Sequence, residues 1–299
     1  MTKISVVINT LNEEGNIERA INSVKDWVYE VVVVDMHSDD RTAKIAEKAG
    51  ARVFTHKRTG YVEPARNYAV SKAKCDWVLI LDADEEISAN LAKELQKRAK
   101  DDNADYYALP RKNIVFGKWL KHSRWWPDYN IRFFKKGKVE WVQEVHSVPL
   151  TAGKGADVEA SEELAIVHRH YASVSQYIQR HDRYSAIMAK EKYRSGEKFN
   201  WKLLISKPSG EFLSRYFAGQ GYKDGVHGLV LSSLQGFVEL LIYVKLWELY
   251  KFPERELSVE EATSELKKAQ LEINYWTADS LVRERGNLVN KIKRKFRLS

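Results

Sequence analysis

Cysteine is nearly absent from this sequence: Cys75 is the only one in 299 residues. A single thiol cannot form an internal disulfide, and its place just before an apolar run favours a buried structural thiol in a chain that a reducing compartment permits. Low-complexity linkers and repeats at a fixed period are missing too, which excludes repeat architectures. With 44% hydrophobic residues, the chain has enough apolar material for one core domain plus an appendage.

Long uncharged runs are also missing. The most apolar stretch, residues 226–250, is interrupted by Glu239 and Lys245, and its uncharged run over residues 228–238 is too short to cross a bilayer. A strand predicted within a few residues of Met1 leaves no room for a signal peptide. We therefore expect the globular part of the chain to face the cytoplasm.

The most informative segment is an apolar run that ends in acid. Residues 77–81 read Trp-Val-Leu-Ile-Leu, and Asp82, Ala83 and Asp84 follow. Such a run predicts a buried strand, and open α/β sheets bind ligands at the carboxyl ends of their strands. Two carboxylates spaced i, i+2 share one face of an extended backbone and suit Mg²⁺ or Mn²⁺ bridging a diphosphate. The alternative is an acidic turn in which Asp84 or Ser88 caps the following helix.

The first third of the chain alternates strands and short helices. Strands are predicted at residues 4–8, 31–34 and 52–55, and Pro64 suits the first turn of a helix that carries Arg66. This alternation predicts parallel βαβ units, so the acid-bearing loops meet at one edge of the sheet. Further strands are expected at residues 106–111, 130–134 and 139–142, with a turn at residues 135–137 between the last two.

Four motifs in this order resemble family 2 glycosyltransferases, which are inverting enzymes of the GT-A fold. They are T-x-N-E-E at residues 10–14; D-x-x-S-x-D-x-T at Asp35, Ser38, Asp40 and Thr42; D-x-D at residues 82–84; and W-P-D at residues 126–128 followed by Arg132-Phe133-Phe134. The last motif is similar to the lipopolysaccharide-core β-glucosyltransferase subgroup. The fold class expected from this resemblance is α/β: a Rossmann-like, mostly parallel mixed sheet with helices on both faces, followed by a C-terminal helical, membrane-associating region.

The resemblance implies a nucleotide-sugar donor and a divalent metal. Thr10, Asn12 and Glu13 are expected beside the ribose and base, Asp35 at the base edge, and Arg66 near the phosphates. The metal, Mn²⁺ or Mg²⁺, is expected on Asp82 and Asp84. A UDP-sugar is the default donor, with GDP-mannose as runner-up because Met36 and His37 depart from the family pattern. The full set of predicted donor-site residues is Thr10, Asn12, Glu13, Asp35, Ser38, Arg66, Asp82, Ala83, Asp84 and Arg132.

Inversion by single displacement needs a base that accepts the proton of the acceptor hydroxyl. Relatives in the subgroup often read V-H-E after the aromatic loop, whereas this chain has Glu144 before His146. We predict Glu144 as the base, because the apolar neighbours Trp141 and Val142 favour a raised carboxyl pKa. His146 and Asp128 are the alternative catalytic residues.

Aromatic and basic residues alternate over residues 118–129. This pattern fits either a core corner packed around indoles or an acceptor loop that stacks on sugar and holds phosphate. Nucleic acid is disfavoured, because loops lined with carboxylates repel phosphate. His168, His170 and His181 have no cysteine or carboxylate partner at a recognisable ligand spacing, which favours structural or acceptor-side roles over a metal site.

The last 130 residues or so are predicted to be largely helical, with domains at residues 1–165 and 166–299. A net charge of +8 and a basic tail after apolar helices indicate an acidic partner. We expect helices over residues 201–250 and the tail to lie on the anionic inner face of the membrane. The alternatives are a helical cap on the catalytic domain or a homo-oligomer interface.

Two classes of function remain at this point. The first is a metal-dependent transferase acting on a lipid-linked or cell-envelope glycan acceptor. The second is a non-catalytic nucleotide-sugar-binding or scaffold protein of the same fold. A nucleotidyltransferase is disfavoured, because residues 12–15 read Asn-Glu-Glu-Gly where such enzymes carry a Gly-rich basic phosphate loop.

Overall fold

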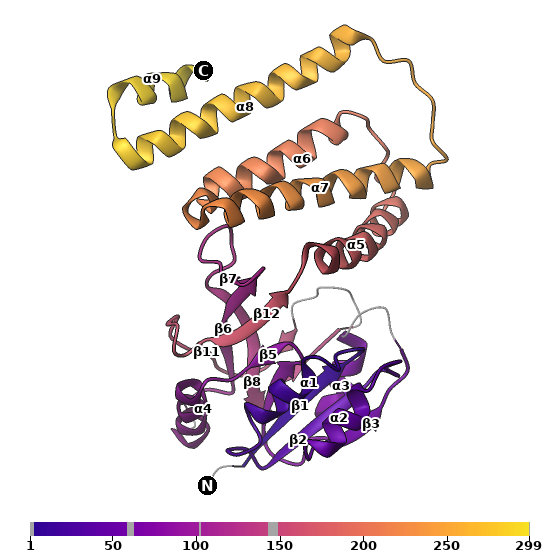
Figure 1. The fold of residues 1–299 in the computed structure, drawn as a ribbon, viewed down its shortest axis with the longest axis vertical. Helices are drawn as coiled ribbons and strands as arrows, with labels where there is room; N and C mark the ends of the chain where they lie inside the picture. Colours follow the sequence, from indigo (N-terminus) through magenta and orange to yellow (C-terminus); the bar gives the residue numbers. More distant parts are fainter. Residues whose placement is uncertain (1–2, 59–62, 102, 143–148, 299) are drawn as a thin grey trace. The chain divides into compact units, whose positions relative to one another are not determined.

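The computed structural model describes residues 3–58, 63–101, 103–142 and 149–298 (Figure 1). The chain forms two compact units, Met1–Ile114 with Trp126–His170, and Val115–Trp125 with Tyr171–Ser299. The sequence predicts a boundary after residue 165, whereas the first compact unit continues to His170 and the second also includes residues 115–125. The sheet explains the difference, since β12 (Ile166–Tyr171) pairs antiparallel with β5 (Glu85–Glu86) and so keeps residues 166–170 in the first unit.

The first unit is built on one mixed sheet. Its parallel half has the order β3-β2-β1-β4, and β8, β6, β12 and β5 follow on the side of β4. β8 runs antiparallel to both β4 and β6, which makes the sheet mixed. The bounds are β1 Ile4–Thr10, β2 Glu30–Asp35, β3 Arg52–Thr55, β4 Trp77–Asp82, β6 Tyr106–Val115 and β8 Asp128–Lys135.

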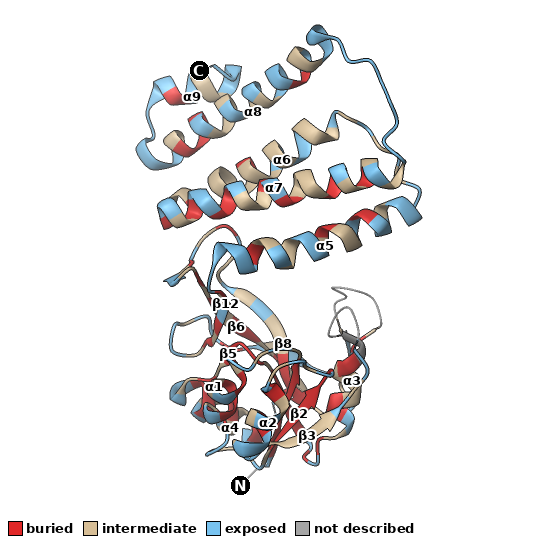
Figure 2. Ribbon diagram, turned by 45° about the vertical axis from the view of Figure 1, so that its right-hand side comes forward, coloured by how far each residue is buried: buried red, intermediate tan, exposed pale blue. Residues whose placement is uncertain are grey.

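Helices cover both faces of this sheet, as predicted. One core contains Val6, Ile8 and Leu79 together with residues of α1 (Ile17–Asn22), α2 (Thr42–Lys48) and α4 (Ala89–Asp101). The other contains Val7, Val32 and Ile80 with residues of α3 (Glu63–Ser71). Successive strand residues point to opposite faces, so the unbroken apolar runs at residues 6–8 of β1 and 77–81 of β4 supply side chains to both cores. Figure 2 shows the middle of this sheet, around β2, as buried.

Two short pairings lie outside the predicted pattern. β9 (Val139–Glu140) pairs antiparallel with β10 (Leu150–Thr151) in a separate two-stranded sheet. The strand predicted at residues 139–142 is therefore short, and it does not pair with β8 across the Lys135–Gly137 turn. β11 (Gly155–Asp157) adds in parallel to β6.

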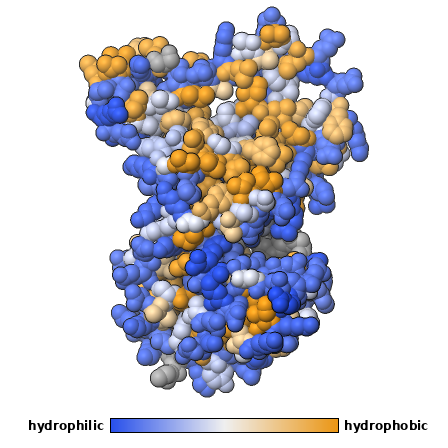
Figure 3. All heavy atoms as spheres, in the orientation of Figure 1, coloured by the Kyte–Doolittle hydropathy of each residue, from blue (hydrophilic) through white to orange (hydrophobic). Residues whose placement is uncertain are grey.

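The second unit is helical, as predicted. Its core gathers Tyr171, Tyr177, Leu231, Ile242 and Leu246 with their neighbours. The helices are α5 Val174–Arg194, α6 Leu203–Leu213, the π-turn η1 Ser214–Ala218, the 3₁₀ turn η2 Gly221–Asp224, α7 Val226–Leu249, α8 Val259–Arg285 and α9 Leu288–Phe296. Apolar side chains gather over the helices of this unit on the face that Figure 3 shows.

α7 is long and apolar enough to cross a membrane, and it is the one such helix in the described part of the chain. The core helices of soluble proteins can be equally long and apolar. In α7, Leu231, Ile242 and Leu246 are buried in the core of the unit, whereas Val226 and Phe237 are exposed. α7 therefore packs one part of its surface into the core of the helical unit and exposes another part.

Candidate functional site

The loops after β1 and β2 are bonded to each other. The Asn12 amide donates to Ser38 Oγ at 2.8 Å, and the Asp39 amide donates to Asn12 Oδ1 at 2.7 Å. Asn12 and His37 have φ of 56° and 58°, in the left-handed region where asparagine is well tolerated. Ser38 Oγ and its amide in turn donate to the carboxylate of Asp35 at 2.5 and 3.0 Å. These predicted donor-site residues thus form one hydrogen-bonded platform at the carboxyl ends of two strands.

A second set of bonds explains the remaining motif residues. The Glu13 amide donates to Thr42 Oγ1 at 2.8 Å, and the Glu14 amide donates to Asp40 Oδ2 at 3.1 Å. Asp40 Oδ1 accepts from the Thr42 amide at 2.9 Å. The acidic and hydroxyl residues of the two motifs therefore join the loops before any ligand is involved. Thr10 Oγ1 is buried at the end of β1 and has no hydrogen-bond partner among the described residues.

Asp82, at the end of β4, is held by two arginines. Its carboxylate accepts from Arg132 of β8 at 3.2 and 2.5 Å and from Arg66 of α3 at 3.2 Å. Burial by itself would raise the pKa of Asp82, but the two guanidiniums outweigh it and hold that pKa well below its usual range. Arg132 is buried with Asp82 and Glu85 beside it, and their charges raise the pKa of its guanidinium against the opposing effect of burial.

Glu85 extends the ion-pair network towards β6. It is fully buried, accepts from the Asp82 amide at 2.9 Å, and lies 3.3 Å from Arg132 and 3.4 Å from Arg111. Arg111 also binds Asp128 with two guanidinium nitrogens, at 2.6 and 3.0 Å. Asp82 and Asp128 are therefore connected through alternating charges on four strands.

Asp84 has a different partner. Its Oδ2 lies 3.5 Å from Nε2 of His168, and both side chains are buried. The pairing of β5 with β12 sets His168 opposite Glu85, and the backbone amide of Arg169 donates to the Asp84 carbonyl at 3.0 Å. A carboxylate oxygen and an imidazole nitrogen this close both fit a cation about 2.1 Å from each of them. Two side chains leave most of a coordination shell to phosphate oxygens and water.

The comparisons with known proteins decide the family. The profile described as "Glycosyl transferase family 2" matches residues 5–164, more than half of the chain. The chain belongs to glycosyl transferase family 2. An uncharacterized glycosyltransferase of Rickettsia typhi is 33% identical over 83% of this chain and 88% of its own length. The lipopolysaccharide core biosynthesis glycosyltransferase LpsC of Rhizobium meliloti is 23% identical over 87% of this chain and 97% of its own.

Solved structures resemble the glycosyltransferase as well. Residues 1–349 of Staphylococcus aureus TarS, in complex with UDP, match with a TM-score of 0.47 and 16% identity, covering 86% of this chain and 94% of that one. Mycobacterium tuberculosis glucosyl-3-phosphoglycerate synthase, in complex with Mn²⁺, UDP and glucosyl-3-phosphoglycerate, matches with a TM-score of 0.33 and 26% identity over 39% of this chain and 45% of that one. The alignment thus spans less than half of the synthase.

The family match and the mixed sheet with helices on both faces confirm the predicted GT-A fold of this glycosyltransferase. The structure brings Arg66, Asp82 and Arg132 together as an ion-paired cluster, and Asn12, Asp35 and Ser38 as the loop platform. Ala83 is buried in the core, and Glu13 contributes its backbone amide. Asp128 is held by Arg111, and the catalytic candidates Glu144 and His146 lie outside the described residues.

His168 is the residue of the glycosyltransferase that sequence reasoning set aside. Its partner Asp84 is 84 positions earlier, so ligand spacing carries no signal. The sequence around His168 could indicate a strand, because apolar residues flank it. The pairing of that strand, β12, with β5 is a tertiary contact that the local sequence does not predict. Among the described residues there is no cluster of three or more side chains that would hold a metal alone.

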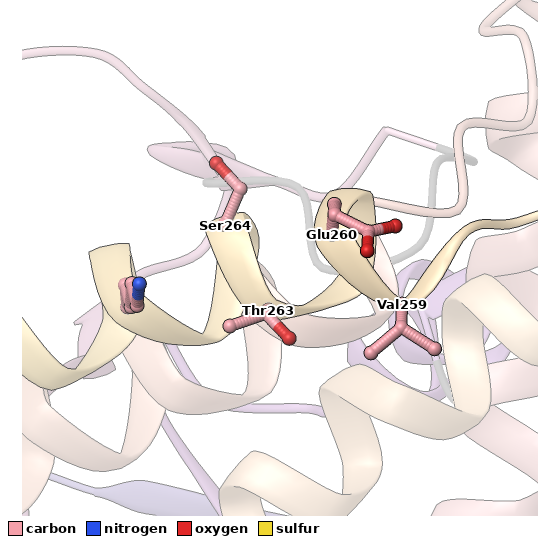
Figure 4. Close-up of a pocket in the computed structure, with 5 residues that line it drawn as sticks. Val259, Glu260, Thr263 and Ser264 are labelled. Atoms are coloured by element: carbon pink, nitrogen blue, oxygen red, sulfur yellow. The ribbon is translucent and has the colours of Figure 1, made fainter.

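The hollow drawn in Figure 4 is not part of this site. Its walls come from one face of α8, in the helical unit of the glycosyltransferase. The residues lining it are Val259, Glu260, Thr263, Ser264 and Lys267. It contains none of the predicted site residues.

Proposed function

We propose that this glycosyltransferase moves a sugar from a nucleoside diphosphate sugar to a lipid-linked or cell-envelope glycan acceptor, with inversion and with help from a divalent metal. The observation that carries the metal dependence is the buried Asp84–His168 pair at the carboxyl edge of the sheet. Bound there, Mn²⁺ or Mg²⁺ would neutralise charge that develops on the leaving diphosphate.

The two aspartates of the D-x-D motif have different roles in this proposal. Asp84 and His168 hold the metal. Asp82, whose oxygens already accept from Arg132 and Arg66, orients those two arginines instead. Arg66 reaches Asp82 at the carboxyl end of β4, which is the edge of the sheet where a diphosphate would approach. The earlier prediction of both aspartates as ligands is thus narrowed to Asp84 with His168.

The loop platform is proposed to hold the nucleoside. Both carboxylate oxygens of Asp35 already accept hydrogen bonds from Ser38. Asp35 could therefore bind the edge of a nucleobase only through the lone pairs that remain. Thr10, whose buried hydroxyl has no partner among the described residues, is the better placed donor of a new hydrogen bond. Uridine diphosphate remains the default nucleotide, with guanosine diphosphate as runner-up.

Glu144 remains the proposed base. Asp128, the alternative within the described residues, accepts from Arg111 and Asn113 on Oδ2 and from Asn130 on Oδ1. An acid engaged in this way suits acceptor positioning better than proton transfer. Glu144→Gln should retain nucleotide binding and lose transfer by several orders of magnitude, whereas Asp128→Asn should retain measurable transfer. The opposite result assigns the base to Asp128.

The acceptor is proposed to be attached to the cell envelope. Similarity to a lipopolysaccharide core biosynthesis glycosyltransferase along nearly the whole chain supports this class. The amphipathic α9 and its basic residues support peripheral binding to the inner face of the membrane. Peripheral binding would let the protein meet its acceptor along the membrane surface without crossing the bilayer.

Calorimetric titration tests the core of the proposal. UDP and GDP, each with and without Mn²⁺, should show one nucleotide that binds at least ten times more tightly with the metal. His168→Gln should remove most of that metal effect and leave metal-free nucleotide binding unchanged. A protein that binds neither nucleotide under any condition would not have the proposed function.

A further inference from the structure

Asn113 of β6 connects the two halves of the candidate site. Its side chain is buried, with 1% of its surface exposed, and it lies between an acid and a histidine. Asn113 Nδ2 donates to Asp128 Oδ2 at 3.0 Å, and Asn113 Oδ1 lies 2.6 Å from Nδ1 of His168. No motif in the sequence points to this residue, because its partners are on β8 and β12.

The chemistry of Asp128 fixes which way the Asn113 amide points. An ionised carboxylate only accepts hydrogen bonds, so the NH₂ group of Asn113 must face it. Arg111 donates to the same oxygen, so that oxygen already acts as a hydrogen-bond acceptor. The carbonyl oxygen of Asn113 therefore faces His168. This orientation follows from the charges and does not depend on telling oxygen from nitrogen in the amide.

The same argument then fixes the imidazole. A carbonyl oxygen only accepts, so Nδ1 of His168 must carry a proton. In the neutral ring this leaves the lone pair on Nε2, the atom that lies 3.5 Å from Asp84 Oδ2. The ring of His168 also stacks on that of His170, with centroids 4.4 Å apart, which limits rotation about its side-chain bonds.

We propose that Asn113 is a positioning residue that holds His168 as the Nδ1–H tautomer, with Nε2 and Asp84 presenting lone pairs to one divalent cation. Histidine ligands are generally oriented by a hydrogen bond from the second ring nitrogen, and loss of that bond weakens metal binding. Here the orienting group is an amide whose own direction is set by Asp128 and Arg111. The inference rests on the proposed function for the identity of the cation, and on the geometry alone for the tautomer.

The tautomer is measured without metal or nucleotide. Long-range ¹H–¹⁵N spectra of the full chain at pH 8.5, assigned with His168→Gln, should show His168 with a protonated Nδ1 and an unprotonated Nε2. Asn113→Leu has nearly the same volume but neither polar group, and should lose this preference. The double variant Asn113→Asp with Asp128→Asn exchanges the two groups, so that a carboxylate at position 113 accepts from both the position-128 amide and Nδ1, and it should restore the preference.

The metal readout uses Mn²⁺ titrated into the protein with saturating UDP, followed by electron paramagnetic resonance. Asn113→Leu should weaken Mn²⁺ binding by about 10- to 100-fold, the usual effect of losing a partner that orients a metal ligand. Asn130→Leu is the matched control: Asn130 Nδ2 also donates to Asp128, at 3.2 Å, but no contact joins it to His168 among the described residues. This control should bind Mn²⁺ within about twofold of the parent protein.

Different results reject different statements. An unprotonated Nδ1 in the parent protein, or equal Mn²⁺ affinity in Asn113→Leu, overturns the role of Asn113. A protonated Nδ1 in a protein that binds no Mn²⁺ with UDP supports the tautomer and rejects the metal-dependent function. If Asn113→Leu does not fold, the parent spectrum and the double variant Asn113→Asp with Asp128→Asn still decide the question.

Discussion

At the scale of single residues, the two aspartates of the D-x-D motif differ because their neighbours differ. Asp82 neutralises Arg132, a guanidinium with 2% of its surface exposed, whereas Asp84 faces the imidazole of His168. A buried cation that loses its partner is costly, whereas the proposed metal site at Asp84 should lose little stability when one ligand is removed. The same substitution should therefore reduce the stability of the protein at Asp82 and its metal-dependent nucleotide binding at Asp84.

Asp82→Asn should lower the free energy of unfolding by about 2–3 kcal/mol, less than the full cost of an unpaired buried charge because Glu85 still lies beside Arg132. Asp84→Asn should change it by less than about 1 kcal/mol and abolish Mn²⁺-dependent UDP binding. Urea unfolding and calorimetry on the two matched variants measure both quantities. A stable Asp82→Asn with normal folding but no metal binding would return the ligand role to Asp82.

His181 of α5 gives the clearest pH dependence in the helical unit. Its ring lies 4.0 Å from that of Tyr177 between centroids, and burial followed by the nearby charge of Arg180 lowers the pKa of His181 to about 4. The folded unit therefore holds the ring neutral, whereas the unfolded chain takes up a proton near pH 6.5. Stability is fully present above that pH and falls as the pH drops towards 4.

Between pH 7 and pH 4.5, this effect should cost on the order of 1–2 kcal/mol after allowance for partial exposure of the ring. His181→Phe keeps the aromatic packing and removes the titration. Unfolding measured at several pH values should show a steeper decline in the parent protein than in the variant. Parallel pH profiles would show that His181 does not titrate between the two states.

At the scale of elements, the sequence predicted those features that depend on the residues of a single segment. The apolar runs of β1, β2 and β4 had to be strands covered on both faces, and the loops after them had to meet at one edge. His168 and Asn113 were beyond this reasoning, because β12 and β6 reach the site by pairing with strands distant in the sequence. The two arginines that bind Asp82 were predicted only in part. The sequence placed Arg66 and Arg132 at the donor site, but it did not indicate that both bind Asp82.

The packing of α7 depends on small residues that the sequence analysis did not single out. A Cβ atom at Gly228 would lie 1.8 Å from the carbonyl oxygen of Gly221, which is backbone and has little freedom to move. A Cβ atom at Gly210, within α6, meets nothing within 4 Å. Both glycines have a helical backbone conformation, but only Gly228 has another backbone segment packed closely against it.

Gly228→Ala should therefore destabilise the protein by about 1–3 kcal/mol or prevent folding, as overpacking against backbone does. Gly210→Ala should be neutral or stabilise by up to about 1 kcal/mol, because alanine favours the helix. Thermal unfolding followed by circular dichroism compares the pair directly. Equal melting temperatures would mean that α7 and η2 separate without cost.

At the scale of the whole molecule, the excess of positive charge predicts an acidic partner. The chain carries a net charge of +8, and α9 concentrates it beside apolar side chains. Leu288, Val289, Ile292 and Phe296 are exposed on α9, with Phe296 at 61%. Arg294 pairs with Asp279 and Arg297 with Glu272, whereas Lys291, Lys293 and Lys295 form no ion pair within the described part of the chain.

An exposed apolar face flanked by unpaired lysines is the composition of a helix that lies in the interface of an anionic bilayer. Flotation with vesicles of phosphatidylglycerol and phosphatidylcholine should recover the protein, and recovery should fall with added salt because the lysines contribute electrostatically. The double variant Ile292→Ser with Phe296→Ser should reduce binding at least tenfold. Leu266→Ser, at an exposed leucine of α8, should leave it unchanged.

The outcomes separate the three interpretations of the helical unit. Loss of binding in the α9 variant alone places the membrane contact on α9, and equal loss in Leu266→Ser extends it to α8. A parent protein that stays unbound at low salt yet elutes as a dimer, with Ile292→Ser and Phe296→Ser eluting as a monomer, makes this face an oligomer interface. If both stay monomeric and unbound, the exposed apolar residues of α9 contact neither lipid nor a second copy, and the acidic partner of the lysines is then the acceptor itself.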